Sequence, residues 1–259
     1  MTILEDLASY AKKRVEQKKK DKSLEQIILE VKKLPKANFE FESALRKTDL
    51  AFICECKKAS PSKGIISADF PYLQIASEFE SAGADCISVL TEPSQFLGSD
   101  KYLYEIANSV SIPCLRKDFI VDEYMVYEAR LLGASAVLLI CSILNSNQLK
   151  RFIKICNDLG LSALVEVHDE VEVIKALNSG AKIIGVNNRN LKDFSIDMEN
   201  SIKLRRLIPK DILYVSESGI KNSDDIKKLR EIGIDAVLIG ESLMKAINKK
   251  EKLDEFRRI

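Results

Sequence analysis

The sequence predicts a (β/α)8 barrel preceded by a helical extension. Four apolar runs open with glycine at regular intervals of 50, 47 and 53 residues. Another short apolar run precedes each of them, which gives eight expected strands, and amphipathic stretches lie between the runs. Strand and helix alternating eight times is the pattern of a closed parallel barrel. The glycine-led runs are Gly83–Leu90, Gly133–Ile140, Gly180–Asn187 and Gly233–Gly240.

The strands between these runs follow from the length of each interval. A strand, a crossover helix and a second strand need at least about 30 residues, so intervals near 50 residues hold two strand–helix steps. Runs that are apolar on both faces predict a parallel sheet covered on both sides. The remaining strands are expected at Ala51–Lys57, Ile112–Arg116, Ser162–Val167 and Ile212–Ser216.

Amphipathic helices are expected between the strands. An open, doubly wound sheet is the alternative arrangement of the same elements. It explains the fourfold repeat less well, and the chain lacks the Gly-x-Gly-x-x-Gly turn that is typical of that fold. The expected helices include Tyr72–Ala82, Glu123–Leu132, Gln148–Leu159, Glu170–Asn178 and Asp224–Ile232.

Residues 1–50 form an expected helical extension that packs on a barrel of residues 51–259. Leu4–Lys20 is amphipathic and ends in a lysine-rich run, and Ser23 with Gln26 resembles a capping box that opens a helix through Val31. Basic residues of this region could bind nucleic acid, but the interleaved acidic residues favour a solvated helix face. The basic residues are Lys12, Lys13, Arg14, Lys18, Lys19, Lys20 and Lys22.

Composition excludes several classes of protein. The net charge of +1 gives no reason to expect binding to nucleic acid or to an anionic membrane. No apolar run has the length of a membrane span, and the N-terminus lacks the apolar core of a signal peptide. We therefore expect a cytoplasmic monomer. The chain has six cysteines but no Cys-x-x-Cys pair and a single histidine, His168, which predicts reduced core thiols with no metal and no cofactor.

Charged residues stand where several strands end, which is where barrel enzymes place their active sites. Burial of an isolated charge costs several kcal/mol, so these residues are expected to serve chemistry rather than packing. Alternation along each strand turns Glu55, Lys117 and Glu166 toward the barrel mouth. Ion pairs that merely fill the barrel are the alternative reading. The strand-end residues are Glu55, Lys57, Lys117, Glu166, Asn187 and Arg189; His168 is expected in a loop, as neither ligand nor base.

The last two strands predict a phosphorylated substrate. Each is followed by a glycine, Gly219 or Gly240, where backbone N–H groups could approach a ligand closely. Ser218 shares the face of Ser216 and is therefore expected to point into the mouth. A phosphate between these two loops is typical of barrel enzymes.

The chain closely resembles the indole-3-glycerol phosphate synthase family, from about Leu24 to its end. Several segments match the family pattern in order, and the first is a Glu-x-Lys-x-x-Ser-Pro-Ser motif. The segments are Glu55–Gly64, Ser88–Glu92 with Phe96 and Gly98, Leu115–Phe119, Leu164–His168, Asn187–Arg189, Ser216–Ile220 and Ile239–Met244.

The resemblance implies roles for the strand-end residues in ring closure, decarboxylation and dehydration. Lys117 would be the acid in ring closure, and Glu55 and Glu166 would stabilise a cationic intermediate. Glu166 and Lys57 would be the acid–base pair of dehydration, with the division between them left open. A phosphoribosylanthranilate isomerase is the rival enzyme, although it usually relies on an aspartate or cysteine base. A barrel that binds RNA through its N-terminal helix is the rival of another class.

The resemblance also implies residues that hold the substrate. Asn187 would bind a sugar hydroxyl, and two phenylalanines would flank the aromatic ring. Anionic groups would be held by a serine and an arginine, and the phosphate would lie on the backbone of the last two loops. These residues are Phe96 and Phe119 for the ring, Ser60 and Arg189 for anionic groups, and Ser218, Gly219, Gly240 and Glu241 for the phosphate.

Overall fold

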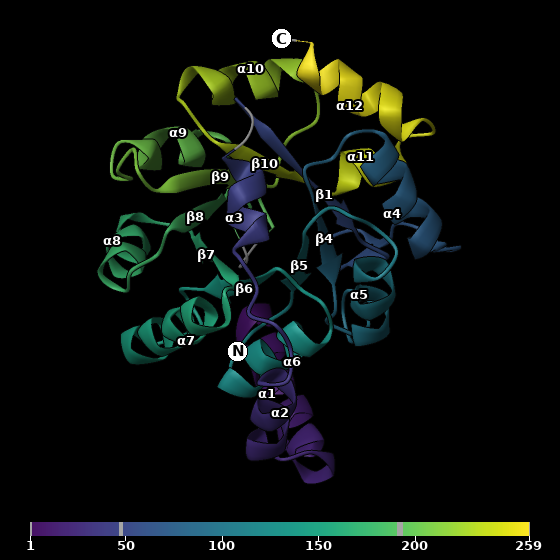
Figure 1. Cartoon of the computed structure of the whole chain (residues 1–259). Helices are drawn as coiled ribbons and strands as arrows, with labels where there is room; N and C mark the ends of the chain where they lie inside the picture. The colour runs from purple at the N-terminus through teal and green to yellow at the C-terminus, as the bar shows by residue number, and fades with distance from the viewer. Residues whose placement is uncertain (1, 47–48, 191–193, 259) are drawn as a thin grey trace.

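Eight parallel strands close into a barrel in the computed structural model, which describes residues 2–46, 49–190 and 194–258 (Figure 1). The prediction of a (β/α)8 barrel is confirmed. The strands neighbour one another in the order β1-β10-β9-β8-β7-β6-β5-β4, so consecutive strands along the chain pair with each other. Their bounds are β1 Ala51–Cys56, β4 Cys86–Leu90, β5 Cys114–Lys117, β6 Ala136–Ile140, β7 Ser162–Val167, β8 Ile183–Asn187, β9 Leu213–Glu217 and β10 Ala236–Ile239.

Helices surround the barrel, and each predicted helix begins or ends within two residues of its expected bounds. Four further helices of the barrel, α5, α9, α11 and α12, were not predicted; α5 buries only Leu103 and Ile106, and α9 buries only Ser201 and Leu204. The helices of the barrel are α4 Tyr72–Ser81, α5 Asp100–Ala107, α6 Glu123–Leu131, α7 Ser146–Leu159, α8 Glu170–Asn178, α9 Glu199–Arg205, α10 Ser223–Glu231, α11 Glu241–Lys245 and α12 Lys249–Arg257.

A small hairpin follows the first barrel strand and was not predicted. Strands β2 (Ala59–Ser60) and β3 (Gly64–Ile65) pair antiparallel. Gly64 has φ +62°, a left-handed conformation that glycine adopts at little cost. The hairpin places Ser60 and its neighbours at the rim of the barrel.

The two faces of β1 have opposite roles. The guanidinium of Arg257 lies 5.1 Å from the ring centroid of Phe52, so this face of the strand is directed at α12. Cys54 and Cys56 share that face, as alternation predicts, and both are buried. Burial raises the pKa of both thiols, which keeps them protonated and unreactive. The opposite face carries Glu55 toward the barrel axis.

Three helices precede β1: α1 (Ile3–Asp21), α2 (Leu24–Val31) and α3 (Glu40–Leu45). The capping box of Ser23 and Gln26 is present at the start of α2, as predicted. Helix α1 buries Leu7, Ala11 and Val15. Figure 1 shows α1 and α2 beside α6, and α2 packs directly against α6.

Basic residues of α1 bind carboxylates of the barrel, which corrects the expectation of a solvated basic face. Arg14 Nη2 lies 2.6 Å from Asp118 Oδ1, and Lys18 Nζ lies 2.6 Å from Glu128 Oε1. Lys19 Nζ lies 2.8 Å from Asp122 Oδ2. Sequence spacing within α1 could not reveal these partners because they lie about a hundred residues further along the chain.

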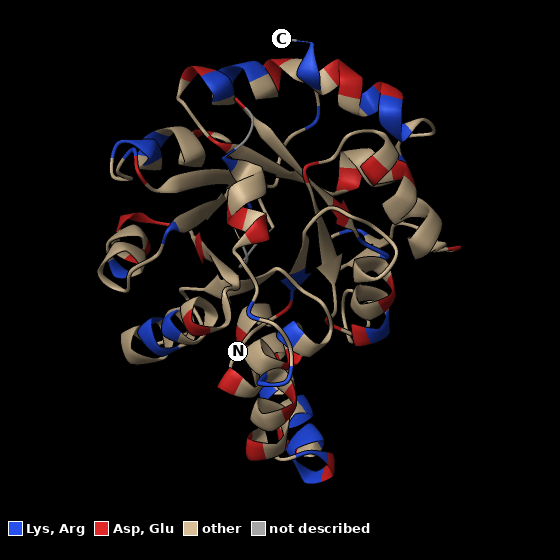
Figure 2. Cartoon of the chain, viewed as in Figure 1, with Lys and Arg blue, Asp and Glu red and all other residues tan. Residues whose placement is uncertain are grey.

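Charged residues otherwise lie mainly on the outer helices, whereas the strands contain few of them (Figure 2). Lys12, Lys13 and Lys20 are exposed members of this outer layer. Within the described part of the chain, no helix is both long and apolar enough to span a membrane.

The segment before α3 crosses the loop between α7 and β7 at Gly160. Backbone N–H groups of Ala37 and Phe39 donate to the carbonyls of Leu159 and Gly160. A Cβ on Gly160 would lie 1.7 Å from the Ala37 oxygen. Glycine is therefore required here by contact with the extension as well as by its φ of +74°.

Replacement of Gly160 by alanine should destabilise the protein more than the same change at Gly233. Both glycines are left-handed, at φ +74° and +69°, but nothing lies within 4 Å of a Cβ on Gly233. We expect Gly233→Ala to cost about 1–2 kcal/mol in free energy of unfolding, from backbone strain alone. Gly160→Ala should cost a further 1–3 kcal/mol or so, the usual range for overpacking. Urea unfolding measures both, and equal losses would contradict close docking of the extension.

Candidate active site at the carboxyl ends of the strands

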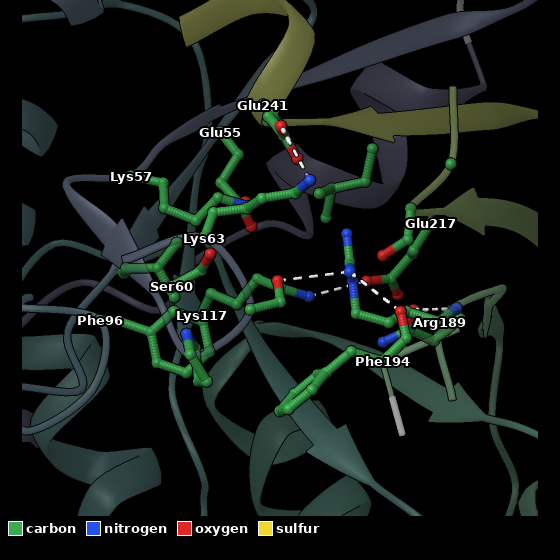
Figure 3. Close-up of a pocket in the computed structure, with 18 of the residues that line it drawn as sticks. Glu55, Lys57, Ser60, Lys63, Phe96, Lys117, Arg189, Phe194, Glu217 and Glu241 are labelled. Carbon is green, nitrogen blue, oxygen red and sulfur yellow. Dashed lines mark hydrogen bonds and ion pairs between the residues drawn. The ribbon is translucent and has the colours of Figure 1, made fainter. Parts of the chain in front are cut away.

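A cavity of about 570 Å³ lies at the carboxyl ends of the barrel strands. All residues predicted to act on or bind the substrate line it, although they come from seven different strand ends and loops. Figure 3 shows how several of them, with residues that the prediction missed, surround this space. The predicted residues lining the cavity are Glu55, Lys57, Ser60, Phe96, Lys117, Phe119, Glu166, Asn187, Arg189, Ser218, Gly219, Gly240 and Glu241.

Lys117 lies at the centre of the charged part of the cavity. Its Nζ is 2.7 Å from Glu217 Oε2 and 3.6 Å from Glu166 Oε2. Strand register brings these groups together, because Glu166 pairs with Gly185 and Glu217 pairs with Asn187 across β8. A Cβ on Gly185 would lie 2.2 Å from Glu217 Oε1, so the glycine makes room for that carboxylate.

Electrostatics keep Lys117 charged. Burial disfavours its ammonium, but the carboxylates of Glu217, Glu166 and Glu55 outweigh burial and raise the pKa of Lys117. Burial raises the pKa of Glu217 to about 6, against the opposing effect of Lys117. The cavity therefore holds a lysine that is protonated throughout the neutral range, next to a carboxyl group that titrates near pH 6.

Glu55 and Lys57 form a second ion pair on the inner side of β1. Lys57 Nζ donates to Glu55 Oε1. Burial opposes ionisation of Glu55, but Lys57 and then Lys117 outweigh it, so the pKa of Glu55 is lowered. A Cβ on Gly240 would lie 2.4 Å from Glu55 Oε1 and 2.8 Å from Lys57 Nζ. The glycine after β10 thus leaves room for this pair.

The rim is closed by contacts between loops that are distant in sequence. Arg189 Nη1 donates to Ser62 Oγ at 3.3 Å, which joins the loop after β8 to the β2–β3 hairpin. The Arg189 backbone N–H donates to Asn187 Oδ1 at 3.0 Å. In the same hairpin is Lys63, whose Nζ lies 3.9 Å from Glu241 Oε1. Cationic groups therefore line one edge of the cavity.

The other side of the cavity is aromatic and apolar. The rings of Phe96 and Phe119 lie 6.2 Å apart, centroid to centroid, at 42°. The carboxylate of Glu92 accepts hydrogen bonds from the backbone N–H groups of residues 94–96, which fixes the turn that carries Phe96. Ile3, Leu4 and Leu7 of α1 complete this side. Such walls suit contact with a flat aromatic group.

One step of the sequence reasoning about β9 was wrong. Ser216 does not face the mouth: its hydroxyl contacts Asn188 and Ser201, between the barrel and α9. Glu217 has the inward position instead. Ser218 reaches the cavity because its own backbone is left-handed, at φ +66°, and not because it shares a face with Ser216.

The glycines near the last two strands lie beside protein side chains. The space beside Gly219, whose φ is +92°, is occupied by Met198 and Ile196. The space beside Gly240 is occupied by Glu55 and Lys57, as described above. Both glycines therefore make room for protein side chains, and a phosphate on their backbone N–H groups stays a prediction. Helix α11 begins after Gly240 without a side-chain cap.

Several charged and aromatic residues of the cavity were missed by the sequence-based prediction. Glu217 could have been found from the alternation of Leu213, Val215 and Glu217 along β9. The others sit in loops or on a short helix, where no periodicity places a side chain. The missed residues include Lys63, Phe194, Glu217 and Lys245.

His168 follows β7 in a loop, as expected, yet its ring lies close to the carboxylate of Glu166. Its Nε2 is 3.5 Å from Glu166 Oε1, and its Nδ1 is 3.2 Å from Glu172 Oε2. Over residues 2–46, 49–190 and 194–258, no three His, Cys, Asp or Glu side chains are grouped so that they could hold a metal ion. The arrangement is suited to proton transfer and to the binding of an anionic, aromatic molecule.

Comparison with known proteins gives the following matches. A family model described as indole-3-glycerol phosphate synthase matches residues 4–256. The indole-3-glycerol phosphate synthase of Ruminiclostridium cellulolyticum is 55% identical over 98% of each chain. That of Endomicrobium trichonymphae is 53% identical over 98% of this chain and 99% of its own. The solved structure of 3-hexulose-6-phosphate synthase from Salmonella typhimurium has a TM-score of 0.66 at 15% identity, over 80% of this chain and 96% of that chain, a likeness of fold alone.

Replacement of Gly240 by alanine should disturb the site without disturbing the barrel. The new Cβ would collide with Glu55 and Lys57, and displacement of reacting groups by about 1 Å can cost about 100-fold in rate. We expect kcat to fall by about that factor, with an unchanged circular dichroism spectrum. A folded Gly240→Ala variant with normal kcat would show that the position of the Glu55–Lys57 pair does not matter for turnover.

Proposed function

The chain belongs to the indole-3-glycerol phosphate synthase family, the carboxy-lyases of tryptophan biosynthesis, and we propose that Lys117 is the proton donor of its ring-closing step. The reaction converts carboxyphenylamino-deoxyribulose phosphate to indole-3-glycerol phosphate, with loss of carbon dioxide and water. The observation that supports the proposal is the Lys117 ammonium, held 2.7 Å from Glu217 and facing Glu166 in the cavity.

Ring closure needs a proton at the sugar carbonyl oxygen. As the aromatic carbon attacks the carbonyl carbon, that oxygen gains negative charge. Transfer of a proton from Lys117 Nζ converts it to a hydroxyl, and an alkoxide is a strong enough base to take a proton even from a lysine of raised pKa. Glu217, which contacts the same ammonium, favours the protonated lysine before each turnover.

Decarboxylation starts from an intermediate whose ring system carries positive charge. Carboxylates aimed at that charge lower its energy, because they are fixed in place before the reaction. Glu55 and Glu166 occupy this position in our proposal. Loss of carbon dioxide returns the bonding electrons to the ring and removes the charge. Both carboxylates are nearly fully buried, which strengthens the effect.

Dehydration needs an acid and a base on neighbouring atoms of the new ring. The hydroxyl leaves as water with a proton from the acid, while the base takes a proton from the adjacent carbon. Glu166 and Lys57 are the pair that we assign to this step. Glu166 lies against Lys117 and Lys57 against Glu55, so both stand next to a group of opposite charge.

Substrate binding divides the cavity into an aromatic part and an anionic part. Phe96 and Phe119 would flank the ring, with α1 behind them. Asn187 would hold a sugar hydroxyl, and Ser60 and Arg189 would hold anionic groups.

The phosphate would lie at the opposite end of the cavity, on the backbone of Ser218, Gly219, Gly240 and Glu241. The side chain of Glu241 contacts Lys245 at 2.7 Å, so only its backbone would meet the phosphate. Lys63 and Lys245 supply positive charge nearby.

We also propose that the enzyme works as a cytoplasmic monomer with its helical extension as part of the site. Ile3, Leu4 and Leu7 of the extension line the cavity. The described structure contains six free, buried cysteines, which suits a reducing compartment. A phosphorylated small molecule is its substrate.

Replacement of Lys117 by alanine should abolish turnover, because it removes the proposed proton donor. Production of indole-3-glycerol phosphate is followed by indole fluorescence with the ribulose phosphate substrate. Lys117→Arg is the matched variant, since it keeps the charge but holds its proton too tightly to donate it. Both should fold, as circular dichroism will check, and near-normal kcat in either would exclude Lys117 as the acid.

Replacement of Glu166 by glutamine should lower kcat by a factor of about 100 to 10,000, the usual contribution of an acid–base group. The amide keeps the shape of the carboxylate but can neither accept a proton nor offset a positive charge. Steady-state kinetics separate kcat from KM. A change confined to KM would mean that Glu166 only binds substrate.

A further inference from the structure

The imidazole of His168 lies between two carboxylates, one of which is assigned a chemical role above. On one side Glu172 Oε2, in the first turn of α8, accepts the backbone N–H of His168 at 2.8 Å and lies 3.2 Å from Nδ1. On the other side Nε2 faces Glu166 Oε1 at 3.5 Å. The side chain of Asn200 donates to the His168 carbonyl at 3.0 Å, which anchors the backbone from α9.

These contacts assign the hydrogens of the ring. An ionised carboxylate can only accept a hydrogen bond, so Nδ1 carries a hydrogen toward Glu172. Nε2 is buried and has no hydrogen-bond partner among the described residues. A neutral ring would therefore turn a lone pair toward the Glu166 oxygen, whereas a protonated ring turns an N–H toward it. The geometry favours the imidazolium.

The surrounding charges act in the same direction. Burial disfavours the imidazolium, but Glu172, Glu166 and Glu217 outweigh burial and raise the pKa of His168 above its ordinary 6.5. Lys175 is the basic residue of α8 nearest in sequence, and its ammonium is directed elsewhere, at the carbonyls of Cys141 and Leu144. The cation facing Glu166 from the cavity side is Lys117.

We propose that His168, in its protonated form, is a positioning residue that aims Glu166 at the substrate. Each oxygen of Glu166 faces one cation, Oε1 toward His168 and Oε2 toward Lys117. When Lys117 turns to the substrate, His168 still holds Oε1, so Oε2 stays directed into the cavity. This inference rests on the proposed role of Glu166.

A pH dependence follows, with a definite sign. The imidazolium is present below the pKa of His168 and disappears as the pH rises through it. Glu166 then loses one of its two partners, so kcat should fall on the alkaline side with the midpoint of the His168 titration.

The experiment compares the pKa of His168, measured by NMR titration, with the pH dependence of kcat. His168 is the single histidine of the chain, so its ring signals report its pKa without assignment, in protein free of a histidine tag. Glu172→Gln keeps an oxygen that can accept from Nδ1 but removes the charge. We expect the titration midpoint and the alkaline limb of kcat to move to lower pH together.

Glu170→Gln is the matched control. It removes the same charge from the same helix, but Glu170 is exposed and pairs with Arg206 rather than His168. Neither the titration midpoint of His168 nor the pH dependence of kcat should change in this variant. His168→Gln should lower kcat by about 10- to 100-fold, as expected for a group that orients a reacting residue, with little change in KM and without the alkaline limb.

Each outcome decides between the two proposals. The role of His168 is overturned if His168 of the wild type titrates at or below pH 6.5. It is also overturned if the pH profile of kcat for Glu172→Gln coincides with that of the wild type. Neither test requires that His168→Gln folds. If Glu166→Gln keeps a normal kcat, the proposed role of Glu166 is wrong. If Glu166→Gln is inactive but the pH profile of kcat for Glu172→Gln is unchanged, the role of Glu166 stands and only the role of His168 is rejected.

Discussion

Burial of the Lys117 ammonium is the constraint on which the rest of the site depends. A charge removed from water needs partners close by, and Lys117 has Glu217, Glu166 and Glu55 around it. Those carboxylates are buried too, so each group is stable only while the others are present. Closure of the barrel brings Lys117 and the three carboxylates together from four different strands, β5, β9, β7 and β1. The same closeness gives the site an ammonium that is always charged and carboxylates directed at the cavity.

Strand β5 links this site to the N-terminal extension through three consecutive residues. Arg116 points outward and is fully buried, with Asp100 and Glu128 each 2.8 Å from its guanidinium. Lys117 points inward, and Asp118 accepts two hydrogen bonds from Arg14 of α1. Lys18 contacts the same Asp100 and Glu128. Helix α1, which lines the aromatic side of the cavity, is thereby tied to the strand that carries the proposed acid.

Space for these charges comes from residues without side chains. Gly185 leaves room for Glu217, and Gly240 leaves room for Glu55 and Lys57. In a barrel of this size side chains normally fill the interior, so a charged cluster needs such openings at the level where it sits. The charged layer of this barrel therefore depends on the positions of these glycines as well as on the positions of the lysines and glutamates.

Sequence alone predicted the order of elements, the barrel and thirteen of the residues that line the cavity, because alternation along a strand, the glycine after each helix and the family motifs are local properties. The sequence-based prediction missed the inward position of Glu217, although the alternation of Leu213, Val215 and Glu217 along β9 carries that signal. Nor did it find the partners of Lys18, the contact of His168 with Glu166 or the protein atoms beside Gly240. Those were decided by the tertiary structure, because which opposite charge or open space a residue meets depends on segments that only the closed barrel brings together.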